Sequence, residues 1–489
     1  MTLSPSRTIQ TQTRATAVAG EATSLLDEDV VNATMMNIRS TVTSKDVTVV
    51  EDIVDTCKLG IPIFWSMLSW VGMKTTDTAL LGHVSSQALA ASALSDLWTM
   101  CTVVFIQGRI LSVLCGAAVG AGNPKLAGVY LQVSYVVLAG LAIPVCAAWF
   151  ATGQVWKVLG SQQEDVANMA GLYARILAIS IPGQLAFSQL SQFFQAQRIM
   201  HPEVNASVAA LVLNLVLGLV LVLGVPIPNF YGFGFVACPS VTTAVVYIQF
   251  FVFYFVYVQI QKLHLPCWGG WDRKEITWKR IQIFSDMVCL DCIGLHFYVL
   301  CDGPFSYKNH YHATNDDCIS LLLPLLQYFP AAFGMASDFW RVAVVGAIAA
   351  DLGETQVAVF NTSYRIMWIV MILVISLSSA AGIKMSNRLG NMDPDGAKQA
   401  GEVGIILSLV VLTIIMVGVF YNIRLFGRIF TSDKEFLDLF ETTRLPFCGT
   451  LFLMNMSVAI ERVPFSMGRT KEVFWMGLMA SWGGMFKLV

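Results

Sequence analysis

Charged side chains are scarce in this chain. Asp, Glu, Lys and Arg make up 13% of its 489 residues, about half of the roughly 25% that is usual in a soluble globular protein. Hydrophobic residues make up 56%. This balance excludes a soluble domain and predicts a protein that lies in a lipid bilayer.

Several functional signatures are also missing. The chain has no G-x-x-x-x-G-K-[ST] phosphate-binding loop, which argues against ATP-driven transport within it. No hydrolytic constellation is present, so we expect no enzyme activity. The net charge is -2 and the basic residues are dispersed, which argues against a nucleic-acid partner. The eleven cysteines are mostly scattered singly along apolar segments, where they act as small hydrophobes and form no disulfide framework.

The amino-terminal segment differs from the rest of the chain. Residues 1–54 are rich in Thr, Ser, Val and acidic groups, and they contain no long apolar core and no signal-type cleavage site. We predict a disordered cytosolic tail.

Long apolar runs follow this tail, and each can cross a hydrocarbon core of about 30 Å. The predicted spans lie near 59–81, 96–121, 127–150, 170–194, 204–225, 232–258, 324–349, 356–382, 401–422, 437–460 and from 473 to the end. The predicted fold is all-α and polytopic, with two pseudo-symmetric six-helix bundles, of which about eleven of twelve helices are present. The predicted units are an N-terminal bundle at 55–260, a cytosolic inter-bundle loop at 261–323 and a truncated C-terminal bundle at 324–489.

The connections between the spans predict the orientation. Basic residues fall in alternate connections, from Lys125 and Arg198 to the group at 262–280 and the segment 384–398. The positive-inside rule places these connections, and the amino terminus with them, in the cytosol. Lys157 and the basic residues at 424–434 break the pattern.

A weak internal repeat indicates the mode of action. The segment 114–128 ends an apolar run with small residues, a glycine turn, a proline and a basic residue, and 381–401 repeats this arrangement in altered form. Such self-similarity between two halves of a membrane chain is typical of secondary transporters with alternating access.

These residues resemble the MATE family, the multidrug and toxic compound extrusion transporters, in their eukaryotic form. The resemblance rests on the motifs at 76–83 with 89–91, 114–122, 194–202, 386–390 and 468–469. It implies twelve helices in two bundles around a central cavity. It also implies export of bulky organic, often cationic, compounds in exchange for H⁺ or Na⁺.

One block departs from the family pattern. Residues 286–323 form an insertion between the sixth and seventh spans, and we interpret it as a translated intron or an unusual loop. The block contains Cys289-x-x-Cys292, with Cys301, His310, His312 and Cys318 downstream. Zinc binding would use such ligands, but the His-x-His spacing is atypical, and we favour a polar loop without metal.

Two carboxylates are candidates for proton or cation coupling. A carboxyl group in the bilayer is costly to ionise, so it can exchange a proton near neutral pH. Asp77 lies near the outer end of the first span and is similar to the first-helix aspartate of prokaryotic members. Asp338 lies mid-span in the seventh helix and resembles an acidic residue of eukaryotic members. The structural alternatives are an interfacial, hydrated Asp77 and an ion pair of Asp338 with Arg341.

Other polar and aromatic residues are candidates for the substrate cavity. We select Gln184, Asn214, Gln249, Trp340 and Tyr364. Aromatic faces attract organic cations, and amides can line a cavity. Amides between membrane helices also serve as interhelical hydrogen bonds, and aromatics also mark lipid interfaces.

The sequence therefore predicts a monomeric, multi-pass antiporter of the plasma membrane or a vacuolar-type membrane. Its partners are small organic substrates and the lipid bilayer, it needs no cofactor, and H⁺ or Na⁺ is the coupling ion. Two alternatives remain: an exporter of lipid-linked sugars or organic acids, and a non-transporting truncated or intron-retaining product.

Overall fold

The computed structural model describes residues 48–467, except 104–105, 107–109, 159–163, 273, 279, 282–283, 285–352 and 429–433. Every regular element in this part of the chain is a helix, so the all-α prediction is confirmed. Five of these helices are long and apolar enough to cross a membrane, or seven if two bent pairs each count as one span.

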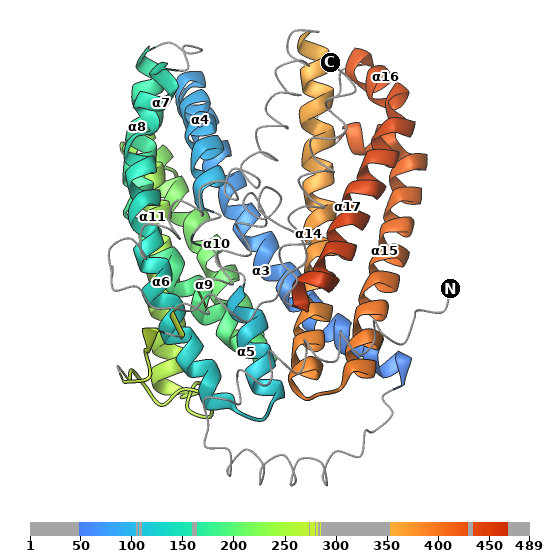
Figure 1. Cartoon of the computed structure of the whole chain (residues 1–489). Coiled ribbons are helices and arrows are strands. Elements are labelled where there is room, and N and C mark those ends of the chain that lie inside the picture. Colours follow the sequence, from blue (N-terminus) through green and yellow to red (C-terminus); the bar gives the residue numbers. More distant parts are fainter. Residues whose placement is uncertain are drawn as a thin grey trace, which may run out of the picture.

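The helices form two groups (Figure 1). The first group consists of α3 (Val49–Val84), α4 (Ser86–Val103), α5 (Ile110–Gly120), α6 (Pro124–Phe150), α7 (Thr152–Val158), α8 (Glu164–Ala178), α9 (Ile181–Ala196), α10 (His201–Leu223), η2 (Gly234–Val236), α11 (Ala237–Phe253) and η3 (Tyr254–Ile260). The second group consists of α14 (Glu354–Gly390), α15 (Pro394–Arg428), α16 (Lys434–Thr442) and α17 (Arg444–Ser466). Each group has its own apolar core, one within 80–284 and one within 359–451.

Helix α3 begins earlier than the predicted span. The Thr48 side chain accepts from the backbone of Glu51, and the Glu51 side chain accepts from the backbone of Thr48. This capping box satisfies backbone donors that a helix start would otherwise leave unpaired. The helix therefore starts at Val49, inside the range predicted as a disordered tail.

Two predicted spans are bent. The predicted span at 170–194 corresponds to α8 and α9, which meet at 50°, and the span at 437–460 corresponds to α16 and α17, which meet at 60°. Pro182 lies in the first turn of α9. A proline in the first turn lacks an N–H that the helix start leaves unpaired anyway. A new helix can therefore start there in a new direction.

The two groups converge at one end of the molecule, the lower end in Figure 1. The connections between α5 and α6 and between α14 and α15 lie at this end, and so does the segment 261–284. These are connections in which basic residues were found. By the positive-inside rule we expect the lower end to face the cytosol, and it is called the cytosolic end below.

The two copies of the internal repeat pack against each other at this cytosolic end. A Cβ on Gly120 of α5 would lie 1.9 Å from the backbone oxygen of Asn387 in α14. A Cβ on Gly390 would lie 2.1 Å from the backbone oxygen of Ala117. Only residues without a side chain permit so close an approach. The glycines of the repeat therefore form the contact between the two groups.

Candidate functional site

Asp77 lies at the centre of a buried polar cluster formed by three helices. Its side chain in α3 is 3% exposed. Thr242 Oγ1 of α11 donates to Asp77 Oδ2 at 2.8 Å, and Asn214 Nδ2 of α10 donates to Asp77 Oδ1 at 3.3 Å. Asn214 Nδ2 also lies 3.4 Å from Thr242 Oγ1. These three residues are called the Asp77 cluster below.

Glycines bring the helices of the cluster close together. A Cβ on Gly72 of α3 would lie 2.9 Å from Leu211 of α10, and a Cβ on Gly218 of α10 would lie 2.4 Å from Leu80 of α3. Small residues at such crossings let helix backbones approach in a membrane. The close crossing of α3 and α10 places Asn214 within reach of Asp77.

The side-chain hydrogen bonds to the Asp77 carboxylate come from uncharged groups, the Thr242 hydroxyl and the Asn214 amide. In the described part of the chain, its closest basic neighbour along α3, Lys74, pairs with Asp96 of α4 at 2.8 Å. Cys238 Sγ donates to the backbone oxygen of Asp77 at 3.8 Å, and Tyr173 Oη lies 3.9 Å from that sulfur. The carboxylate is thus held by neutral dipoles, with its neighbouring cation engaged elsewhere.

One acceptor atom of the Asp77 cluster can take a further hydrogen bond. Asn214 Oδ1 is buried and has no hydrogen-bond partner among the described residues. Buried polar atoms usually have a partner. An acceptor beside a carboxylate suits a ligand that donates a proton or carries positive charge.

The predicted cavity residues separate into different places. Gln249 Nε2 donates to Ser207 at 3.3 Å, and Gln184 Nε2 donates to Ser180 at 2.7 Å. In the second group, Tyr364 stacks on Phe360 with ring centroids 6.3 Å apart and meets Trp368 edge-on with centroids 6.2 Å apart. Of the predicted site residues that the structure describes, only Asp77 and Asn214 contact each other.

Some predicted sites fall outside the described residues. Asp338, Trp340 and the cysteines and histidines of the 286–323 insertion are in this class. Within the described residues, no group of three His, Cys, Asp or Glu side chains could hold a metal ion. The metal question for the insertion therefore stays a prediction.

Sequence reasoning missed Thr242, Asp96 and Lys74. A threonine in an apolar helix reads as an ordinary interhelical or back-bonding hydroxyl. The only signal for its role was its place on the same helix face as Gln249, seven residues later. Lys74 and Asp96 are 22 residues apart, and nothing in the sequence pairs them.

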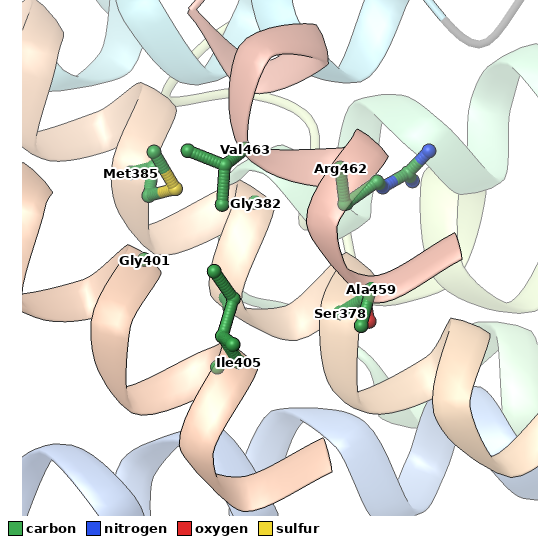
Figure 2. A pocket seen from close by; sticks show the side chains of 10 residues that line it. Ser378, Gly382, Met385, Gly401, Ile405, Ala459, Arg462 and Val463 are labelled. Atoms are coloured by element: carbon green, nitrogen blue, oxygen red, sulfur yellow. The ribbon is translucent and has the colours of Figure 1, made fainter. Parts of the chain in front are cut away.

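Two small cavities lie near α14 and α17. The first, shown in Figure 2, is lined by side chains of the second group, including Met385, Ile405 and Arg462. In this view the guanidinium of Arg462 extends away from Met385 and Val463. The second cavity lies between the two groups and is lined by Ser112, Gln195, Ser379, Ser386, Arg462 and Ser466, among others. Neither lining includes Asp77.

The fold and the buried carboxylate define a class, the multi-pass helical membrane transporters built from two related halves. The MatE family model matches residues 62–220 and 330–483, one stretch in each half and together more than half of the chain. The chain belongs to the MATE family.

Named relatives agree with this assignment. The chain is 22% identical to Multidrug and toxin extrusion protein 1 of Danio rerio over 390 residues, which are 79% of this chain and 58% of that protein. It is 25% identical to Protein DETOXIFICATION 18 of Arabidopsis thaliana over 405 residues, which are 77% of this chain and 73% of that protein. The chain thus spans less than two thirds of the Danio rerio protein's length.

A solved structure shows the same fold. The eukaryotic MATE transporter AtDTX14 matches with a TM-score of 0.70 at 17% identity, over 88% of this chain and 93% of that chain. This likeness confirms the predicted fold class. Together with the apolar helices it makes the protein an integral, multi-pass membrane protein.

Proposed function

We propose that this protein is a secondary antiporter that exports organic, cationic or amphipathic compounds in exchange for H⁺ or Na⁺. The observation that carries the proposal is Asp77, a buried carboxylate held by neutral donors from two neighbouring helices. Intramembrane carboxylates are rare and are usually found on ion or proton pathways. The names of the relatives, which refer to multidrug and toxin extrusion, support export as the direction of transport.

The Asp77 cluster supplies what ion coupling needs. An ionised carboxylate in a low-dielectric site is costly unless a cation or a proton neutralises it. Thr242 and Asn214 reduce that cost with hydrogen bonds but add no positive charge. Binding of H⁺ or Na⁺ at Asp77 therefore changes the net charge of the first helix group by one unit. An exchange cycle requires such a difference in charge between the ion-bound and the ion-free state.

Antiport also requires a contact that closes one side of the membrane at a time, and the contact between the two helix groups can act in this way. The ends of α5 and α14 pack together at the cytosolic end, so the structure is closed on that side. Alternating access needs this contact to open in another state of the cycle. We infer that neutralisation of Asp77 is linked to this opening through α3, which contacts both groups.

Asp338 remains the second proposed coupling residue. The proposal rests on the resemblance of its segment to the seventh helix of eukaryotic family members. In this cycle, Asp338 holds substrate or cation in one state and releases it when it is protonated from outside.

Proteoliposomes that contain the full chain and a fluorescent organic cation test the proposal. An imposed H⁺ or Na⁺ gradient should drive transport of the cation by the wild-type protein. Asp77→Asn keeps the size of the side chain but removes its charge and replaces one of its two acceptor oxygens by a donor, so gradient-driven transport should fall at least about tenfold. Asp165→Asn, an exposed aspartate at the start of α8, is the matched control and should transport normally.

The outcomes separate the alternatives. Wild-type transport without a response to either gradient contradicts coupling. Coupled transport that persists in Asp77→Asn removes Asp77 from the mechanism and leaves Asp338→Asn as the variant to examine. No transport by correctly folded wild-type protein favours the non-transporting alternative.

A further inference from the structure

A second carboxylate, Glu203, lies in the first turn of α10 and is held from two other helices. Ser66 Oγ of α3 donates to Glu203 Oε1 at 2.8 Å, and Gln195 Nε2 of α9 donates to Glu203 Oε2. The network continues beyond these contacts. Ser66 Oγ lies 3.1 Å from Ser207 Oγ, which also accepts from Gln249 Nε2 of α11.

The hydrogen-bond partners of Glu203, Ser66 and Gln195, are both uncharged. Among the described residues, no ion pair involves it, and the nearby charged groups have other partners. Arg198, which precedes α10, lies 3.9 Å from Asp55 of α3. The ring of His201 packs edge-on against Tyr257 of η3 with centroids 5.8 Å apart. On α11 the polar group that faces this network is Gln249.

An apolar layer separates this network from the Asp77 cluster. Met73, Ala210, Val241 and Val245 form a buried apolar contact between α3, α10 and α11. Ala210 lies between Ser207 and Asn214 on α10, and Val245 lies between Thr242 and Gln249 on α11. The first helix group therefore has two polar levels, with Asp77 on the outer side of the layer and Glu203 on the cytosolic side.

Glu203 lies next to the contact that closes the cytosolic end. Gln195, its hydrogen-bond donor, also lines the cavity between the two groups. Met200, three residues before Glu203, packs in one apolar cluster with Ala380 and Ile383 of α14. Gln195 and Glu203 are half-buried, and separation of the two groups at this end would expose both further to cytosolic water.

We propose that Glu203 is a second proton-binding carboxyl, which holds a proton while the cytosolic contact is closed and releases it to the cytosol when that contact opens. In the release step the carboxyl O–H bond breaks, the proton passes to water, and a carboxylate remains. The inference rests on the proposed antiport. A carboxylate without a cation partner is costly to ionise away from water and cheap to ionise in contact with it. The opening of the cytosolic contact brings Glu203 into contact with water and so lowers the free energy of ionising its carboxyl group.

Labelling with the hydrophobic reagent dicyclohexylcarbodiimide tests this proposal on the full chain in proteoliposomes. The reagent reacts with protonated carboxyl groups, and mass spectrometry locates the adduct. Between pH 6 and 8 we expect Glu203 to be labelled, and to be labelled several-fold more at the lower pH. Glu402, an exposed glutamate on the cytosolic part of α15, is the control and should remain unlabelled by the hydrophobic reagent.

Transport by Glu203→Gln supplies an independent measurement. This variant should lose the dependence of transport on cytosolic pH, whereas Glu402→Gln should keep it and Glu203→Asp should restore part of it. Absence of an adduct on Glu203, or an unchanged cytosolic pH dependence in folded Glu203→Gln, overturns the proposal. Failure of the antiport proposal is distinguishable, because it would appear as absent gradient-driven transport in the wild-type protein. Labelling, which needs no variant and no transport, would still decide whether Glu203 carries a proton.

Discussion

Asp52 is a buried carboxylate of a different kind from Asp77 and Glu203. Its side chain is fully buried at the start of α3. Arg388 of α14 donates to both of its oxygens, at 3.0 and 2.6 Å, and Lys384 Nζ lies 2.7 Å from Oδ1. Lys384 also donates to the Asp52 backbone oxygen and to Thr56. This salt-bridge network indicates a structural role for Asp52 and not a role in proton or cation exchange, because the carboxylate already pairs with two cations.

Removal of the Asp52 charge should therefore destabilise the protein. Asp52→Asn leaves the buried Lys384 and the half-buried Arg388 without a counter-charge, and breaking a buried ion pair typically costs about 3–5 kcal/mol. Asp55→Asn, one turn away on the same helix, removes a half-exposed partner 3.9 Å from Arg198 and should cost less than about 1 kcal/mol. Thermal unfolding in detergent measures both variants. Equal decreases of the unfolding temperature in the two variants would show that the Asp52 salt bridges contribute no more to stability than the exposed Asp55 pair.

Acid should remove the same contribution. Burial raises the pKa of Asp52, but the hydrogen bonds and charges of Lys384 and Arg388 outweigh it, so the pKa lies below its ordinary value. A lowered carboxyl pKa means that the stabilisation is complete above the unfolded-state pKa of about 3.9 and is lost as the pH falls through the folded-state value. The unfolding temperature should fall below about pH 4 in the wild type, and this fall should be smaller in Asp52→Asn.

Sequence analysis found some of these residues and not others, for physical reasons. Asp77 stood out because a carboxylate inside an apolar run is unusual. Asp52 did not, because it lies among polar residues before the apolar run begins, and its partners are more than 330 positions away. Glu203 follows a Pro at a predicted helix start, where an acidic residue is ordinary. Only the three-dimensional packing distinguishes it.

At the scale of elements, the contact between α5 and α14 depends on the absence of side chains. Gly120→Ala would place a methyl group 1.9 Å from the Asn387 backbone oxygen, so the helices must move apart. We expect hydrogen exchange of the backbone amides at 381–390 to rise several-fold in this variant, as the cytosolic contact loosens. Gly140→Ala is the control, because a Cβ there has nothing within 4 Å and exchange should not change. Similar exchange in the two variants would contradict a sealing role for Gly120.

The sequence analysis did not predict this contact. The repeat at 114–128 and 381–401 was recognised as evidence of duplication, and its glycines as turn residues. The structure adds that the glycines lie where the two copies meet. Helix bends were harder to place, because Pro182 and Pro446 permit a bend but do not determine its angle.

At the scale of the whole molecule, two of the four basic exceptions to the predicted orientation have acidic partners. Lys157 lies 2.9 Å from Glu164, and Arg424 pairs with Asp438 and Glu441. The positive-inside rule counts Lys and Arg and not the net charge, so these pairs do not remove the exceptions. The orientation therefore needs a direct test.

Cysteine accessibility tests this orientation. In spheroplasts or right-side-out vesicles, a membrane-impermeant maleimide should label Tyr231→Cys, which replaces a 91% exposed side chain in the connection before η2. Lys262→Cys and Lys398→Cys should react only after permeabilisation, because their connections face the cytosol. Labelling of Lys262→Cys from outside would reverse the orientation of the first helix group.

Helix α3 is held at its two ends by different helix groups. Its first turns are fixed to α14 through Asp52, and its later turns are fixed to α10 and α11 through Asp77. A straight rod held in this way cannot follow two bodies that rotate apart. Either the Asp52 clamp releases, or the rod flexes near Pro62, where the helix lacks one backbone hydrogen bond. As long as the Asp52 clamp holds, a movement at the cytosolic mouth is transmitted along α3 toward the Asp77 carboxylate, about 25 residues away.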